Sequence, residues 1–320
     1  MKVLFGLLVT GACLLAAVDG VVMNATTGKP QPSVLITLVQ PQQDGMHTIA
    51  SVKGDAEGKF HIDKELPPGP ALLQAIYQGV VYTQVIPPGT PTTGVSVKVY
   101  DSTKNPESGN AAQHMILIEP SASALQISET FLYENKTQLT YSDPSKGSAQ
   151  FYVPKEAEGK IQVTVNTSGG MPISRDAEKT KQPGIYKVDY PVKPGQTRFD
   201  VGYSLPAGDT FAGKNLDGGE NSFLVTPPSV TLTGEGIDDL GQEPQTHAHT
   251  YRVRGATFEV KIEGTGSLRE PTAAAAEEDT GQPQIEQAPA RVYSKLTWVL
   301  ALTLGVLALG GTMLFRKGTA

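Results

Sequence analysis

Short apolar runs, broken every few residues by glycine or proline, are the feature that most constrains the fold of this chain. The 320 residues include 34 glycines and 24 prolines, and both residue types end strands and form turns. In residues 95–99 three valines alternate with serine and lysine, which is the period of a half-buried strand. The pattern predicts an all-β protein.

The runs fall into two regions, 18–101 and 113–264, separated by a polar linker at 102–112. The first region predicts a seven-stranded, transthyretin-like or Ig-like β-sandwich, and the second predicts a larger β-sandwich. The expected strands of the first are 20–23, 34–39, 48–52, 60–62, 72–77, 80–86 and 95–99. Those of the second are 114–119, 124–134, 148–153, 161–166, 185–190, 197–204, 222–226, 230–233 and 257–262.

The stretch KGDAEGKFHI at 53–62 raises the choice between a cation site and a turn. Asp55 can hydrogen-bond the backbone two residues on, and Gly58 can adopt positive φ without steric cost. A calcium loop needs six to eight oxygen ligands, more than Asp55 and Glu57 supply. The stretch therefore favours a structural turn between two strands.

The same region carries four motifs in order: GVVMN and TTGKP within 20–38, GDAEGKFHI at 54–62, and LPPGPALLQAIYQGVVY at 66–82. As a set they resemble the carboxypeptidase regulatory-like domain, a transthyretin-like β-sandwich, over residues 18–101. That family usually has tyrosine after the last Pro-Gly, where this chain has Pro70 and Ala71. The resemblance implies a sandwich and no catalysis. ISETFLYEN at 127–135 and PVKPGQTRFDVGYSLP at 191–206 resemble parts of uncharacterised bacterial envelope proteins.

Both ends of the chain resemble membrane signals. Lys2 precedes an apolar run, which predicts a signal peptide at 1–17 with cleavage near Ala17; the alternative is a lipoprotein anchored through Cys13. Residues 296–315 are uncharged and are long enough to cross a bilayer as one helix. The predicted order is a periplasmic or extracellular body, an acidic, proline-rich stalk at 265–295, a transmembrane helix and a cytoplasmic tail at 316–320.

Composition limits the function classes. The net charge of −6 and the scattered basic residues argue against a nucleic-acid partner. Cys13 is the one cysteine, so the mature chain is expected to lack disulfides, thiolate metal sites and a cysteine nucleophile. No cofactor motif is present, so no cofactor is expected.

Two histidines, His247 and His249, could hold a metal if they alternate on a strand, but no other ligand motif supports this. The alternative is an exposed edge between a loop and a strand. An acidic segment nearby, which includes Asp238, Asp239 and Glu243, is expected to be a solvated loop.

Glu129 stands out because alternation places it on one strand face with Leu125, Ile127, Phe131 and Tyr133. A buried carboxylate is costly unless it is paired or hydrogen-bonded. The candidate binding residues are therefore Glu129, Tyr133, His247 and His249, with a satisfied structural carboxylate as the alternative for Glu129.

These observations predict a non-enzymatic, membrane-anchored envelope protein that binds a protein partner, with strand edges as contacts. Carbohydrate binding and a hydrolase using scattered carboxylates are the alternatives. Solvent-facing tyrosines in one row, from the set 82, 100, 133, 152, 186, 190 and 203, would favour glycan binding. Three Asn-x-Ser/Thr sequons, at Asn24, Asn135 and Asn166, are interpreted as chance occurrences in a bacterial chain.

Overall fold

Strands and turns make up the part of the chain that the structure describes. The computed structural model describes residues 17–268, apart from 43–44, 67, 106–108, 110, 169 and 217–220. It places no helix among them, which confirms the all-β prediction, and so none of these residues forms a helix able to cross a membrane. The predicted leader with Cys13, the stalk beyond Leu268 and the predicted span at 296–315 lie outside the described residues.

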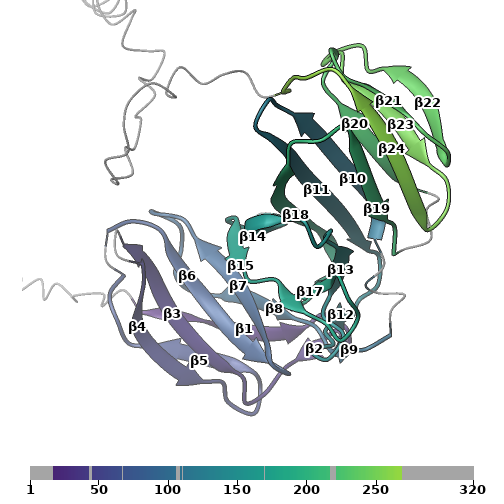
Figure 1. Cartoon of the computed structure of the whole chain (residues 1–320). Coiled ribbons are helices and arrows are strands. Elements are labelled where there is room, and N and C mark those ends of the chain that lie inside the picture. The colour runs from purple at the N-terminus through teal and green to yellow at the C-terminus, as the bar shows by residue number, and fades with distance from the viewer. Residues whose placement is uncertain are drawn as a thin grey trace, which may run out of the picture. The chain divides into compact units, whose positions relative to one another are not determined.

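Two four-stranded sheets enclose the first hydrophobic core (Figure 1). One contains β1 (Val18–Asn24), β2 (Lys29–Pro30), β5 (Lys59–Ile62) and β8 (Val95–Val99), of which β8 pairs with β1 in parallel. The other has the order β4 (Gly45–Lys53), β3 (Leu35–Gln42), β6 (Ala71–Tyr77) and β7 (Val80–Ile86). Ile36, Leu38 and Leu73 of the second sheet are fully buried in this core.

Two turns in this first region depend on positive φ or on a side-chain hydrogen bond. Gln78 and Gly79, between β6 and β7, both have positive φ, 48° and 78°, as a two-residue hairpin turn of type I′ requires. Asp55 Oδ1 accepts hydrogen bonds from the backbone N–H groups of Glu57 and Lys59, at 3.0 and 2.7 Å. Gly58 has a φ of 73°. The stretch 53–62 is thus a turn closed by its own aspartate, and one carboxylate oxygen is already occupied by two donors.

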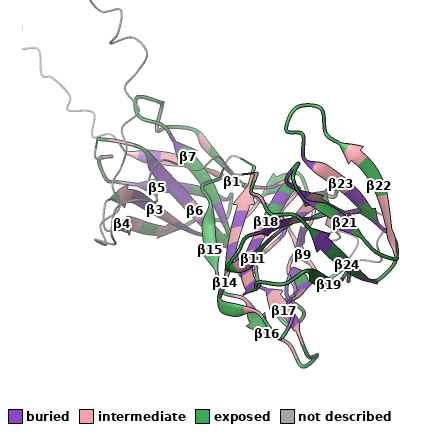
Figure 2. Ribbon diagram, turned by 45° about the horizontal axis from the view of Figure 1, so that its top comes forward, coloured by how far each residue is buried: buried purple, intermediate pink, exposed green. Residues whose placement is uncertain are grey.

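An eight-stranded sheet forms the base of the second region. In spatial order it contains β15 (Ile173–Arg175), β14 (Glu158–Thr167), β18 (Gly195–Pro206), β11 (Ala124–Asn135), β10 (Ala111–Pro120), β20 (Ser222–Thr226), β23 (His249–Val253) and β22 (Ile237–Gln242). All neighbours are antiparallel except β10 and β20. Buried and more exposed residues alternate along the central strands (Figure 2).

Two small sheets cover one face of the eight-stranded sheet and complete the second core. One contains β13 (Ala149–Tyr152), β17 (Ile185–Val188) and β16 (Glu178–Lys179); the other contains β19 (Thr210–Lys214), β24 (Thr257–Glu263) and β21 (Thr231–Thr233). Phe131 of β11 meets Phe151 of β13 with ring centroids 6.2 Å apart, and Tyr251 OH of β23 accepts the N–H of Leu232 at 3.0 Å. The opposite face of the large sheet is therefore its outer face.

The expected linker also contributes to the fold. β9 (Ser102–Thr103) pairs in parallel with β12 (Thr140–Tyr141). Tyr82 OH of β7 is 2.8 Å from Thr140 Oγ1, so a buried hydrogen bond joins a residue of the first core to the second region.

Sequence patterning missed several strands of the second region. β19 and β23 lie where no strand is expected, and residues 237–242, expected as an acidic loop, form the edge strand β22. Gly241, with a φ of 84°, and a register shift beside it interrupt the β22 pattern. Aspartate and glycine are uncommon in strands, but an edge strand tolerates them because one side of it faces solvent.

Candidate functional site

The outer face of the eight-stranded sheet carries two rows of side chains that cross neighbouring strands. Pairing places Thr164, Asp200, Thr130 and Met115 side by side on β14, β18, β11 and β10. The next row is Gln162, Gly202, Ser128, Leu117 and Val225, which reaches β20. Since side chains alternate between the faces of a strand, the inward neighbours of these residues build the core. The outer rows are polar at the β14 end and apolar at the β20 end.

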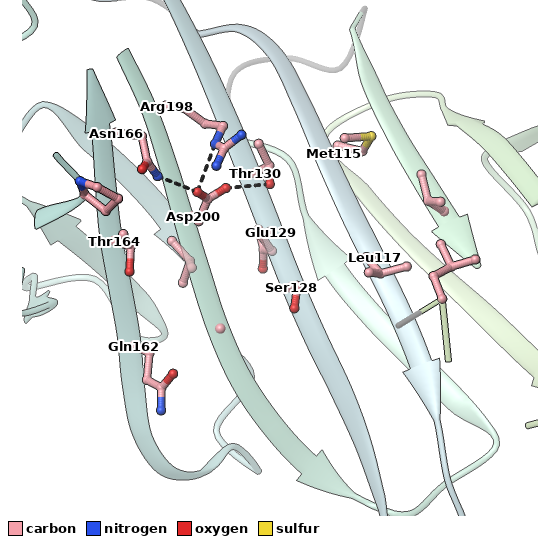
Figure 3. Close-up of a pocket in the computed structure, with 15 residues that line it drawn as sticks. Met115, Leu117, Ser128, Glu129, Thr130, Gln162, Thr164, Asn166, Arg198 and Asp200 are labelled. Carbon is pink, nitrogen blue, oxygen red and sulfur yellow. Dashed lines mark hydrogen bonds and ion pairs between the residues drawn. The ribbon is translucent and has the colours of Figure 1, made fainter. Parts of the chain in front are cut away.

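Asp200 is the centre of the polar half (Figure 3). Its Oδ1 accepts a hydrogen bond from Thr130 Oγ1 at 2.9 Å. Its Oδ2 accepts from Asn166 Nδ2 at 2.8 Å and from Arg198 Nε at 2.9 Å. Three strands therefore hold one carboxylate, which in turn fixes the amide of Asn166 and the guanidinium of Arg198.

A shallow hollow of about 690 Å³ lies over these rows. Gly202 leaves space in its floor, because a Cβ built there would meet nothing within 4 Å. Met115, Leu117 and Val225 form its apolar side, and Met115 is 38% exposed. We call this feature, with the residues of the two rows and Asn166 and Arg198, the outer-face hollow.

The last described residues form one rim of the outer-face hollow. Glu119, on the outer face of β10, is buried and accepts hydrogen bonds from Ser267 Oγ at 2.6 Å and from the backbone N–H of Leu268 at 2.7 Å. Gly266 donates its N–H to Pro120 O, and Leu268 lines the hollow. The first residues of the expected stalk are thus bound to the sheet beside the hollow.

The carboxylate of Glu129 points into the core instead, and its burial is compensated. Glu129 Oε2 lies 2.8 Å from His114 Nε2, and Oε1 accepts the hydroxyl of Tyr203 at 2.7 Å. The His114 ring stacks on Phe131, with centroids 4.1 Å apart. Burial first, and the Glu129 charge second, raise the pKa of Tyr203 well above its usual value. The carboxylate has the partners expected of a satisfied structural residue.

Other residues singled out from the sequence lie apart from the hollow. Tyr133 is buried and meets Phe199 edge-on at 5.2 Å. His247 lies in a turn with a φ of 57°, so it does not alternate with His249 on a strand. His249 begins β23, where its Nε2 is 2.9 Å from Asp239 Oδ1 and its ring stacks on Tyr251. Across the described residues, no three His, Cys, Asp or Glu side chains group in a way that could hold a metal.

The tyrosines and sequon asparagines are largely covered by the fold. Of the seven tyrosines that could have formed a glycan-stacking row, four are buried and three are half-buried: buried are 82, 133, 190 and 203, and half-buried are 100, 152 and 186. Asn24 and Asn135 are 2% and 4% exposed. The Nδ2 of Asn135 donates to Leu139 O and Val192 O, so neither amide is open to modification in the folded chain.

Comparison with known proteins adds little to this geometry. No family model matches the chain, and no curated protein matches it. Among solved structures it is similar to a two-domain M1 zinc metallopeptidase mutant bound to L-tryptophan (10% identity, TM-score 0.26) and to the M1 zinc metallopeptidase from Deinococcus radiodurans (11% identity, TM-score 0.25). Each match covers 48% of this chain and 42% of the other, so this chain spans about two fifths of their length. A likeness at this level assigns neither a family nor an activity.

The residues that build the outer-face hollow were not singled out from the sequence as site residues, and Asn166 was noted only as part of a sequon. Thr130, Asn166, Arg198 and Asp200 each look like an ordinary outward residue of an alternating strand. The available signal was the outward placement of Arg198 and Asp200 within one strand, two residues apart. Their meeting with Thr130 and Asn166 depends on strand order, which alternation alone does not give.

Proposed function

We propose that this chain is a non-enzymatic, membrane-anchored envelope protein whose exported β-sandwich regions bind a protein partner. The observation that carries the proposal is the outer-face hollow, in which a fixed polar network borders a partly exposed apolar strip. Protein interfaces combine an apolar centre with a polar, hydrogen-bonding rim. Side chains that are already held in place lose less entropy when a partner binds.

The alternatives have less support from the same geometry. A hydrolase with carboxylate catalysis needs two carboxyl groups that face a shared space. In the hollow, Asp200 already accepts three hydrogen bonds, and the Glu129 carboxylate faces the core. A glycan site is typically lined by exposed aromatic rings, whereas the candidate tyrosines are buried or half-buried.

Strand edges offer a second contact surface for the same function. β4 lies at the end of its sheet and pairs with β3 on one side. Its nine residues include one charged side chain, Lys53, and its Met46 is 48% exposed. Natural edge strands are commonly protected by charges or proline, so a weakly protected edge suits addition of a partner's strand.

Membrane anchoring rests on the sequence alone, on the uncharged run at 296–315 and the apolar leader. Together they predict that residues 18–268 face the periplasm or the exterior. Alkaline extraction and protease accessibility of cells that produce the full chain test this part. Release at high pH, or protection of the body from external protease in spheroplasts, would contradict it.

Site-specific photocrosslinking in native membranes tests the binding function. A photoreactive residue at Gln162 or Met115, on opposite sides of the hollow, should give a discrete adduct with another protein. The matched control places the same residue at Lys98, an exposed position of β8. If all three positions give only the same heterogeneous crosslinks and no discrete adduct, the outer-face hollow has no partner.

A further inference from the structure

The outer-face hollow presents one fixed cation on its polar side. Asp200 binds Arg198 through Nε alone, and among the described residues no second ion pair is formed by this guanidinium. The Arg198 side chain is 53% exposed, so its terminal nitrogens remain available to a ligand. A guanidinium whose Nε is already bound can use its two terminal nitrogens to bind a carboxylate with two parallel hydrogen bonds.

An apolar contact lies at a defined distance from this cation. Arg198 is on β18, Met115 and Leu117 are on β10 two strands away, and Val225 is on β20 three strands away. Neighbouring strands are about 4.8 Å apart, and the register offsets Met115 by two residues and Val225 by four residues along the strand from the row of Arg198. The backbone of Met115 is therefore about 12 Å from that of Arg198, and the backbone of Val225 is about 20 Å away. Same-face residues four apart in an extended peptide are separated by about 13 Å.

The surface between these two points can bind a peptide backbone. Ser128 of β11 supplies a hydroxyl group there, and Gly202 of β18 leaves room above the floor. Thr164 and Gln162 of β14 line the other side of β18. We infer that the hollow selects an extended segment of the partner that carries a carboxylate side chain and an apolar side chain about four residues apart. This inference rests on the proposed function, because it names the chemistry of the partner at the same site.

Panning of a randomised nine-residue peptide library against the full chain in nanodiscs tests the inference. Wild type should enrich peptides with Asp or Glu about four residues from an apolar residue. Arg198→Gln should lose the acidic preference and keep the apolar one, whereas Met115→Ser should weaken the apolar preference. Lys98→Gln removes an equal charge from an exposed position elsewhere and should change nothing. For one selected peptide, replacing its Glu by Gln should weaken binding roughly tenfold to wild type and hardly at all to Arg198→Gln.

A blocking variant separates failure of this inference from failure of the proposed function. Gly202→Phe fills the hollow at a position where a Cβ meets no neighbour, and it should abolish enrichment. Peptides that Gly202→Phe excludes but that show no acidic preference would overturn the inference and leave partner binding intact. Enrichment that is equal for wild type and Gly202→Phe, or absent from both, would remove the hollow as a peptide site and the inference with it.

Discussion

The buried cluster of His114, Glu129 and Tyr203 gives the sharpest test of how the second core is held together. Glu129 and His114 are 3% and 4% exposed, and the carboxylate makes one contact at 2.8 Å and one at 2.7 Å. Leaving a buried hydrogen-bonding group without its partner typically costs about 1–3 kcal/mol, and more for a charged group. Glu129→Ala strands the imidazole and the hydroxyl together, so we expect a loss in that range. The free energy of unfolding of a whole protein is typically about 5–15 kcal/mol, so the expected loss is a large fraction of it.

Urea unfolding of the purified protein, followed by far-UV circular dichroism, measures this loss as a shift in midpoint at constant slope. Glu134→Ala, on the same strand with 44% of its side chain exposed, is the matched control and should cost less than about 0.5 kcal/mol. The triple variant His114→Phe, Glu129→Met, Tyr203→Phe replaces all three polar side chains of the cluster with apolar ones. It leaves no buried polar group unpaired there, so its stability should approach that of wild type. A loss below about 1 kcal/mol for Glu129→Ala would refute the reasoning, because the carboxylate would then be hydrated rather than buried.

Three further predictions follow from individual contacts. Burial lowers the pKa of Lys193 to about 8, against about 10.4 in an unfolded chain, so the unfolded chain binds more protons between these values and stability rises with pH there. This rise in the free energy of unfolding, at most about 3 kcal/mol, should vanish in Lys193→Met. It should persist in Lys155→Met, because the Lys155 side chain is 90% exposed. Equal pH dependence of the two variants in urea unfolding would contradict this. Gly58→Ala should lower the free energy of unfolding by about 1–3 kcal/mol more than Gly28→Ala does. Both glycines have positive φ, 73° and 71°, but only a new Cβ at Gly58 meets backbone atoms, at 3.0 Å. Equal melting temperatures of the two variants would contradict this. Glu119→Ala should speed proteolytic cleavage after Gly266, because Ser267 and Leu268 lose their acceptor; an unchanged rate would show that this carboxylate does not hold the segment.

Local chemistry made much of the fold predictable. The hairpin turn at Gln78 and Gly79 follows from the two-residue gap between the expected strands 72–77 and 80–86, with glycine at its second position. Alternation over 124–134 predicted one buried face, and all five of its members are at most 3% exposed: Leu125, Ile127, Glu129, Phe131 and Tyr133. In such cases the information lies within a few residues, because steric preference and side-chain period are local properties.

The missed strands show where local chemistry fails. Residues 237–242 contain Asp238, Asp239 and Gly241, which indicate a loop, yet they pair with β23. The pairing partner decides their structure, and tertiary context overrides the weak preferences of the segment. His247 likewise adopts positive φ because its N–H bonds Glu243 O at the end of a turn, so the alternation expected of His247 and His249 never develops.

The outer-face hollow extends this argument from strands to function. Asp200 meets Thr130 across 70 positions of sequence and Asn166 across 34, because β11, β18 and β14 are neighbours in space. A shift of one residue in either pairing would turn the partner side chains to the face opposite Asp200. The register that buries Phe131, Phe199 and Val165 opposite one another therefore also assembles the polar network on the other face. The packing of the core thus positions the surface that we propose for binding, even though no single strand marks it.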